Sequence, residues 1–258
     1  AEGLEAFEDL GFTSSSGNLT GEGWESSFGA GVRLGWLGKF HNDRLNVGVN
    51  YSSRVYMTEF DKYKNAFAEQ GDFDIPSSYA IGIGFKATPS VGIAFDIQRI
   101  NWSEVASIGN PGPAVTAPLD GNLFELCPGP NKDPCKLGGD LGLGFGWVDQ
   151  TVFKLGVDWQ YSQKLALRAG WNYGEAPIPE DQVLFNMLAP ATPEHHLTLG
   201  GGYNFTENVI LDLNLMIAFL NTIKGPTAFG PGGAYVAGSN ASIAMGQYGL
   251  GATVGIKF

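Results

Sequence analysis

The last stretch of the chain, QYGLGATVGIKF at positions 247–258, alternates apolar residues with small or polar ones. Because side chains on a β-strand point to opposite faces in turn, Tyr248, Leu250 and Val254 share one face of this stretch. Gln247 and Thr253 share the opposite face with glycines. The alternation predicts a strand with one apolar face and one small or polar face, which limits the chain to folds built from two-faced sheets.

The same alternation recurs along the rest of the chain. The other stretches that carry it are 28–37, 45–57, 79–85, 91–102, 151–161, 165–173, 197–205 and 209–219. In the pair 151–161 and 165–173, Phe153 and Leu155 lie on one face while Lys154 and Asp158 lie on the other. Together with the closing stretch, these segments predict about nine antiparallel strands.

The connections between these strands alternate in length. Short ones at 38–44, 88–90, 162–164 and 206–208 are interleaved with long ones at 58–76, 103–147, 174–194 and 220–243. Outer-membrane barrels have this arrangement, with short periplasmic turns and long extracellular loops. The polar strand face also carries charges such as Lys86, Asp96 and Asp212, which a packed sandwich core would leave unpaired. The fold class predicted is therefore all-β, an antiparallel transmembrane β-barrel of the outer-membrane type.

Composition agrees with this fold and excludes others. Charged residues make up only 16% of the chain, below the quarter or so that is typical of soluble domains. No run approaches the 18 or so apolar residues of a transmembrane helix, and only helices and closed barrels satisfy their backbone groups in lipid. The net charge of −11 argues against a nucleic-acid partner.

Two regions are expected. Residues 1–23 form an extracellular loop with a short amphipathic helix, because Leu4, Phe7 and Leu10 recur at helical spacing. Residues 24–258 form a single transmembrane barrel portion. Within the polar connection 58–76, Tyr63 and Phe67 are four residues apart and predict one or two helical turns.

The two cysteines, Cys127 and Cys135, lie in the glycine- and proline-rich stretch LCPGPNKDPC. This setting favours a small loop closed by a disulfide in an oxidising compartment, and two free thiols are the alternative.

The pair His195 and His196 does not predict a metal site. Adjacent residues of a strand point to opposite faces and cannot bind one ion together. No nucleophile elbow, Walker motif or Cys-x-x-Cys motif is present, so we expect neither a cofactor nor enzyme activity. An outer-membrane lipase that uses one histidine with a serine is the enzymatic alternative.

Several short motifs resemble the FadL-type family of outer-membrane transporters for long-chain fatty acids and other hydrophobic compounds. They are FDIP at 73–76, Asp96 followed by NWS at 101–103, LRAG at 167–170, PIP at 177–179, FNMLAPAT at 185–192 and HHLTLG at 195–200. Their order and spacing, from about residue 24 to 221, carry the resemblance.

The resemblance implies a monomeric barrel of about fourteen strands with an N-terminal plug, in the outer membrane of a Gram-negative bacterium. This chain resembles only the later strands of such a barrel, without the plug and the early strands. We therefore expect an incomplete barrel whose remaining strands come from further sequence or from another chain, since nine strands do not give the even number of a single-chain bacterial barrel. Outer-membrane lipid would surround it.

The resemblance also implies passive uptake of a hydrophobic small molecule, most simply a long-chain fatty acid or a hydrocarbon. Family members capture it in a groove between two extracellular loops, which correspond here to residues 1–23 and 58–76. Leu4, Phe7, Leu10, Tyr63 and Phe67 would give that groove its apolar surface. The alternative is that these residues only pack the two loops together.

A second site in the barrel lumen would need apolar loop residues above a cation that pairs with a carboxylate. Phe185, Leu188 and Arg168 are the candidates, unless Arg168 is instead paired with Asp158 or Asp212 in the barrel wall. The alternative function is a barrel that acts mainly as a surface receptor or adhesion scaffold through its long loops.

Overall fold

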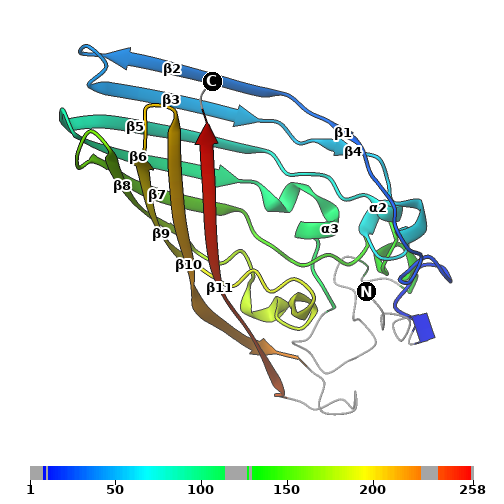
Figure 1. Ribbon diagram of the computed structural model, residues 1–258. Helices are drawn as coiled ribbons and strands as arrows, with labels where there is room; N and C mark the ends of the chain where they lie inside the picture. The colour runs from blue at the N-terminus through cyan, green and yellow to red at the C-terminus, as the bar shows by residue number, and fades with distance from the viewer. Residues whose placement is uncertain (1–7, 10, 114–126, 128–129, 228–237, 257–258) are drawn as a thin grey trace.

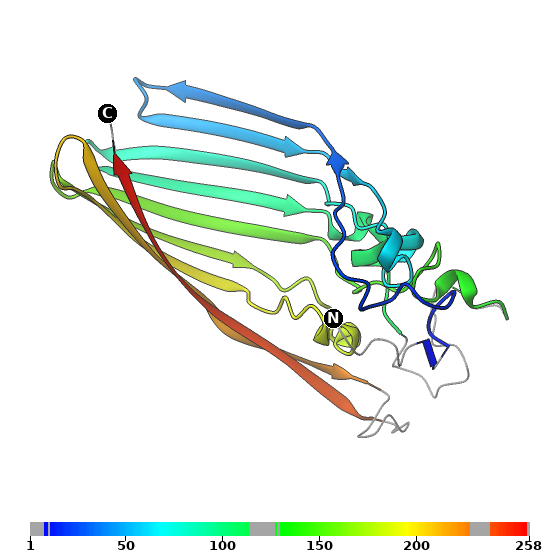
Figure 2. The same cartoon turned by 45° about the vertical axis from the view of Figure 1, so that its right-hand side comes forward.

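The structure, a computed structural model, describes residues 8–9, 11–113, 127, 130–227 and 238–256. Its main element is a nine-stranded antiparallel sheet in the order β11-β10-β9-β8-β7-β6-β5-β3-β2, so neighbours in sequence are neighbours in space. Figures 1 and 2 show the sheet curved into an open trough, with the long connections and the helices α2 and α3 gathered at one end. The prediction of about nine antiparallel strands is confirmed.

The predicted stretch 28–37 is divided, because Gly29–Ala30 belongs to a separate small sheet and the large sheet begins at Arg33. The strands of the large sheet each overlap one predicted stretch. They are β2 (Arg33–Phe40), β3 (Leu45–Ser52), β5 (Ser78–Thr88), β6 (Val91–Ile100), β7 (Gln150–Gln160), β8 (Leu165–Gly174), β9 (His195–Asn204), β10 (Val209–Pro226) and β11 (Asn240–Ile256). A second sheet pairs β1 (Gly29–Ala30) with β4 (Tyr56–Met57).

Short helical turns occupy the long connections. They are η1 (Asp61–Tyr63), α2 (Ala68–Gly71), η2 (Trp102–Glu104), α3 (Ala106–Gly109), η3 (Asp133–Cys135), η4 (Glu180–Gln182) and η5 (Phe185–Met187). Among the described residues, no helix is long and apolar enough to cross a membrane.

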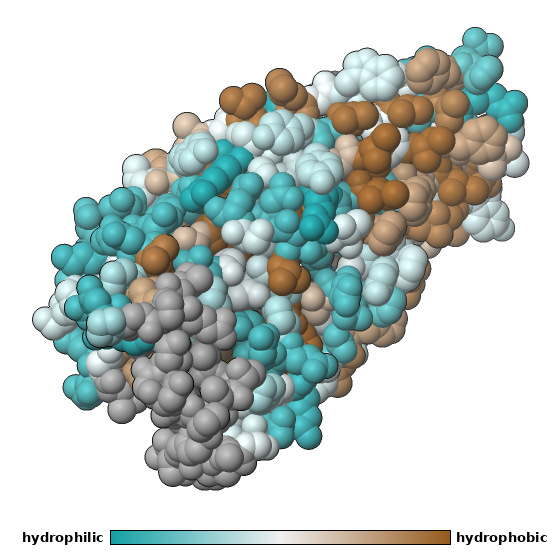
Figure 3. All heavy atoms as spheres, turned by 180° about the vertical axis from the view of Figure 1, so that it is seen from behind, coloured by the Kyte–Doolittle hydropathy of each residue, from teal (hydrophilic) through white to brown (hydrophobic). Residues whose placement is uncertain are grey.

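One face of the sheet is apolar and unusually exposed, as the alternation predicts. Its large side chains include Trp36, Ile81, Phe95, Leu155, Leu199, Leu213 and Leu250. Leu250 is 86% exposed and Ile81 is 55% exposed, although both belong to regular strands. Hydrophobic residues gather on the sheet-bearing half of the molecule and hydrophilic ones over the half with the long connections (Figure 3). Such an exposed apolar surface is suited to contact with lipid rather than water.

Aromatic residues mark both borders of this apolar face. At the ends with short turns, Trp159 packs edge-on against Tyr161 at 5.0 Å, and Tyr203 packs against Phe205 at 4.9 Å. At the opposite ends, Tyr51 pairs across the strands with Tyr79. On β5, Tyr79 and Phe85 are about 20 Å apart at roughly 3.4 Å per residue, close to the apolar band of about 25 Å in outer-membrane barrels.

The sheet has two open edges. Within the described chain, β2 pairs only with β3 and β11 pairs only with β10. Because the nine strands meet at eight antiparallel junctions, β2 and β11 run in the same direction. They cannot close the sheet against each other with the antiparallel pairing used everywhere else in it.

The structure differs from the prediction at β10 and β11, which extend well past the other strands into a region expected to be a loop. A β-bulge at Phe219 and Leu220 faces Gly246, and pairing then resumes from Asn221 to Pro226. The extension is stabilised by an apolar cluster of Ile178, Val183, Ile223 and Ile243. This contact joins segments far apart in the chain, so local periodicity does not reveal it.

Thr192 fixes the bulge to the connection before β9. Its side chain is fully buried, and its hydroxyl donates a hydrogen bond of 2.9 Å to the Asn221 carbonyl oxygen while accepting one from the Met245 N–H. The Asn221 amide in turn donates to the Thr192 carbonyl oxygen. One threonine therefore satisfies backbone groups on both extended strands where the ladder is interrupted.

A second bulge ends the regular part of β3. On one side of the bulge, the Ser53 N–H donates a hydrogen bond of 2.9 Å to the Val32 carbonyl oxygen. On the other side, Tyr56 pairs with Ala30. Between them, Arg54 and Val55 face the single residue Gly31. The stretch 45–57, predicted as one strand, is therefore divided into β3 and β4, with Arg54 in the bulge between them.

The close approach of the 175–193 connection to β10 gives a test. A β-carbon at Gly225 would lie 1.6 Å from the Glu180 carbonyl oxygen, so Gly225→Ala must displace backbone. We expect this variant to release the η4 segment and to accelerate its proteolysis in lipid vesicles. Gly92→Ala is the matched control, because no atom lies within 4 Å of that position. Equal protection of the two variants would contradict the packing described here.

Candidate functional site

The concave face of the sheet combines polar side chains with glycine in a regular way. A polar residue on one strand stands opposite a glycine on the next. The pairs are Asp96 with Gly82, Thr198 with Gly170, Arg168 with Gly200, Asp212 with Gly202 and Asn214 with Gly251.

The glycines leave space into which the polar side chains extend sideways. A β-carbon at Gly82 would lie 1.9 Å from the Asp96 carboxylate, and one at Gly202 would lie 2.6 Å from that of Asp212. The polar side chains therefore lie along the wall instead of projecting into the trough, which keeps the trough open.

Two adjoining hollows follow this wall. The larger, of about 810 Å³, is lined by residues of β3 and of β5 to β10, and the smaller, of about 440 Å³, lies over β2, β3, β5 and β6. They share Asn46, Gly84 and Ala94. Glycines from several strands, such as Gly84, Gly156 and Gly200, are among the residues that line them.

Arg168 lies in the larger hollow and is paired with two carboxylates. Its Nε donates to Asp158 at 2.9 Å, and Nη1 lies 3.5 Å from Asp212. The guanidinium reaches Asp212 across β9, where Gly200 and Gly202 leave space. The sequence left two roles open for Arg168, pairing with a ligand carboxylate or pairing with aspartates of the barrel wall. In the structure it pairs with the aspartates of the wall.

The structure does not bring Arg168 together with Phe185 and Leu188. Arg168 lies near the short-turn end of β8, about 20 Å of strand away from the connection that carries the other two. Phe185 is buried in a loop core beside the disulfide, and Leu188 is 53% exposed. A shared ligand site of these three residues stays a prediction, and the structure described here does not bring them into contact.

The loop core joins the segment before β1 with the connections 103–147 and 174–194, and Ala66 of the connection 58–76 packs against it. Its buried members are Leu19, Cys127, Cys135, Leu137, Leu143 and Phe185. The two sulfurs are bonded at 1.97 Å, and the disulfide closes a short loop within the longest connection. Backbone hydrogen bonds between Phe12, Ser14 and Leu137 attach the segment before β1 to this core. The long connections thus pack together at one end of the trough (Figure 2).

Tyr63 and Phe67 lie in the connection 58–76 but not on one helix. Tyr63 belongs to η1, and its hydroxyl donates to the Gly23 carbonyl oxygen. Phe67 has extended backbone angles, φ −119° and ψ 146°, and its ring packs edge-on against Phe73 at 4.9 Å and near Phe60 at 5.9 Å. The helical turn predicted to join them is replaced by a turn and an aromatic cluster of Phe60, Phe67 and Phe73.

Polar contacts join the two predicted groove loops, and Ala66 also packs against the apolar cluster that contains Leu19. Asn65 is 2% exposed, donates to the carbonyl oxygens of Ser15 and Gly17, and accepts from the Ser15 hydroxyl at 2.9 Å. Leu4, Phe7 and Leu10 lie outside the described residues. The apolar groove therefore stays a prediction.

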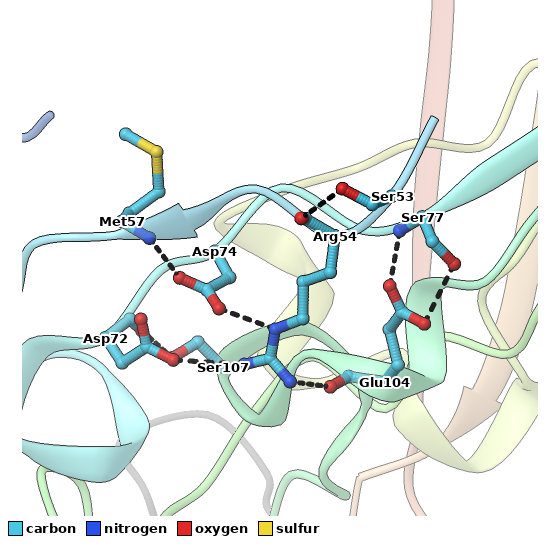
Figure 4. A network of polar contacts seen from close by, with 8 residues as sticks. All are labelled: Ser53, Arg54, Met57, Asp72, Asp74, Ser77, Glu104 and Ser107. Carbon is cyan, nitrogen blue, oxygen red and sulfur yellow. Dashed lines mark hydrogen bonds and ion pairs between the residues drawn. The ribbon is translucent and has the colours of Figure 1, made fainter. Parts of the chain in front are cut away.

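A cluster that sequence reasoning missed surrounds Arg54 (Figure 4). Its guanidinium donates to Asp74 at 2.5 Å, to Asp72 at 3.3 Å and to the Glu104 carbonyl oxygen at 2.7 Å. The Glu104 carboxylate accepts from the backbone and hydroxyl of Ser77. Two of the family-like motifs, FDIP and the segment after NWS, thus meet at one arginine.

Burial raises the pKa of Asp72 to about 7, and a hydrogen bond to Asp74 and the negative charge of Asp74 add to this effect. The neighbouring Arg54 acts in the opposite direction. The only hint in the sequence is the spacing of two aspartates around Phe73.

The two histidines lie on opposite faces of β9. His195 stacks on Tyr173 at 4.8 Å and on Trp171 at 5.7 Å, both on the apolar face. His196 pairs with Asn172 and Ala218, on the polar face. Within the described ranges, no group of three or more histidine, cysteine, aspartate or glutamate residues could hold a metal ion.

The sequence matches the family model described as outer membrane protein transport protein (OMPP1/FadL/TodX) over residues 12–241. This match spans most of the chain. The chain belongs to this family. It is an outer-membrane β-barrel protein of the Gram-negative type, as the motifs and the strand pattern predicted.

Solved structures support the fold. The P. putida toluene transporter TodX is similar with a TM-score of 0.53 and 18% identity, over 90% of this chain and 50% of that one. A Pseudomonas aeruginosa FadL homologue is similar with a TM-score of 0.51 and 13% identity, over 87% and 50%. The chain spans about half the length of these structures. A search of curated protein sequences found no match.

Arg54 and Arg168 allow a matched test, since each is paired with two aspartates but in different surroundings. Arg54 is 24% exposed and Asp74 only 3%, whereas Arg168 and its partners are about half exposed. We expect Arg54→Met to cost about 3 kcal/mol, because it leaves a buried carboxylate unpaired, and Arg168→Met to cost less than about 1 kcal/mol. Urea titration in lipid vesicles measures both, and equal losses would contradict this ranking.

Proposed function

We propose that this chain forms part of a barrel for passive uptake of hydrophobic small molecules across the outer membrane. The observation that carries the proposal is the division of one sheet into a lipid-facing apolar surface and an open inner trough, with packed loops at one end. Membership of an outer-membrane transport family supports it. No covalent step is needed, since the molecule would move down its own gradient.

In this proposal, the molecule is first captured on the loops. The aromatic cluster of Phe60, Phe67 and Phe73 supplies apolar contact area in the connection 58–76. Leu4, Phe7 and Leu10 would complete the groove from the other loop. Tyr63 would act mainly by holding the loops together through Gly23.

We infer further that the molecule is uncharged, a hydrocarbon rather than a fatty acid. A buried carboxylate needs a cation as its partner. Arg54, Arg99 and Arg168 are each engaged with aspartates of the protein itself. The toluene transporter among the similar structures points in the same direction.

The two open edges of the sheet, β2 and β11, limit how the barrel can be closed. Since β2 and β11 run in the same direction, we propose that an odd number of further antiparallel strands closes the barrel between them. A second copy placed by rotation about the barrel axis would again bring parallel edges together. The closing strands would therefore come from further sequence or from a different chain.

One observation favours the receptor alternative. The hairpin of β10 and β11 continues for about 25 Å beyond the last pairing with β9, which ends at Ala218. Such a projection could present a binding surface outside the cell. In that case the barrel would show no transport of small hydrophobic molecules.

The test compares uptake of toluene and of octanoate into liposomes that contain the protein. We expect toluene uptake above that of empty liposomes and no comparable uptake of octanoate. Phe67→Asp should lower toluene uptake about tenfold by placing a charge in the apolar cluster, while Phe67→Leu should retain most of it. Uptake equal to that of empty liposomes would reject transport in favour of the receptor function.

A further inference from the structure

Arg54 connects three separate parts of the extracellular end. From the bulge opposite Gly31, its side chain extends between the connection after η1 and the η2 segment, where it contacts Asp72, Asp74 and the Glu104 carbonyl oxygen (Figure 4). Val55 and Ile75 form a β-bridge beside it, and the single guanidinium, with its donors in one plane, adds the η2 segment to this contact.

The two aspartates on this guanidinium are not equivalent. Asp74 is 3% exposed and also accepts the Met57 N–H at 2.6 Å, so both of its oxygens have donors. The Asp72 side chain is 16% exposed and has the longer contact, 3.3 Å to Arg54. Asp72 is the member that can exchange a proton with solvent while Asp74 stays in place.

The turn directly before Asp72 is strained. Glu69 and Gln70 have φ angles of 54° and 55°, in the left-handed region that residues with a β-carbon rarely adopt. The turn is held by hydrogen bonds from Glu69 and Gln70 to the carbonyl oxygens of Gly139 and Gly138. The Gln70 side chain adds a contact of 2.7 Å to Asp140. A strained segment of this kind persists only while the contacts on both sides hold it.

The same turn separates two rings of the aromatic cluster. Phe67 precedes α2 and Phe73 follows Asp72, yet their rings meet at 4.9 Å. This contact depends on the folded turn, because an extended chain would place residues six apart in sequence about 20 Å from each other. Release of the turn would therefore separate Phe67 from Phe73.

We propose that Arg54, Asp72 and Asp74 form an acid-stabilised latch, which keeps the turn at 68–76 closed and the aromatic cluster assembled. The latch itself stands on the contacts around Arg54. Its effect on ligand capture rests on the proposed function.

The charged groups that face Asp72 fix the direction of the pH effect. Asp74 and Glu69 disfavour its ionised form, and Arg54 favours it. Glu104 contributes its carbonyl oxygen to Arg54, while its carboxylate is bound to Ser77. With a pKa raised to about 7 in the folded protein, Asp72 stabilises the closed turn when protonated. This stabilisation is complete below the ordinary aspartate pKa near 4 and is lost as the pH rises through about 7.

Amide hydrogen exchange of residues 68–76 tests the latch in the full chain, reconstituted in lipid vesicles. After correction for the intrinsic pH dependence of exchange, we expect opening of the turn to increase about tenfold between pH 6 and pH 8.5. Asp72→Asn keeps an oxygen for Arg54 but cannot ionise, so its opening should not change over this range. Asp61→Asn, an exposed carboxylate in the same connection, is the control and should behave like the unmodified protein.

Two results would overturn the latch: a flat profile in the unmodified protein, or the same rise in Asp72→Asn. Toluene binding measured at both pH values on the same samples separates the latch from the capture surface. If exchange responds to pH and binding does not, the latch stands and the capture surface on Phe67 is rejected.

Discussion

The structure depends on the need of every strand in a sheet to pair its backbone groups while its side chains divide between two faces. In lipid this need is absolute, since an unpaired N–H or carbonyl costs several kcal/mol there. The nine strands meet it by meandering, each pairing with its neighbours in sequence. The same need for backbone pairing applies to the two outer strands of the sheet. β2 and β11 run in the same direction, so they cannot pair with each other in the antiparallel way that the rest of the sheet uses.

The concave face shows how a wall can be polar without filling the space it surrounds. Charged and amide side chains lie across glycines of the next strand, as Asp96 does over Gly82 and Asp212 over Gly202. Arg168 uses the same space to reach a second aspartate. The abundance of glycine, 38 residues, thus serves the shape of the trough as much as its turns. Because these ion pairs are exposed, we assign them to the lining of the wall rather than to its stability.

Sequence reasoning failed where a contact joins distant segments or depends on depth in the barrel. The extension of β10 and β11 was read as loop because its stabilising contacts, with Val183 and Thr192, come from the preceding connection. Arg168 and Phe185 were grouped by chemistry, although one lies in the wall and the other in the loop core. The Arg54 cluster was missed because its partners, Asp72, Asp74 and Glu104, come from other segments of the chain.

The sequence alone determined the number of strands in the sheet, their antiparallel order, the side of each that faces lipid and the membership of an outer-membrane transport family. The strand features follow from period-two alternation and connection length, which are local properties of the chain, and the family resemblance follows from the order and spacing of short motifs. Only the tertiary structure decided which charges pair with each other, how the long connections pack around the disulfide, and where Phe67 and Phe73 meet. Those outcomes depend on the curvature of the sheet and on contacts between loops, and neither is encoded in the spacing of residues along one strand.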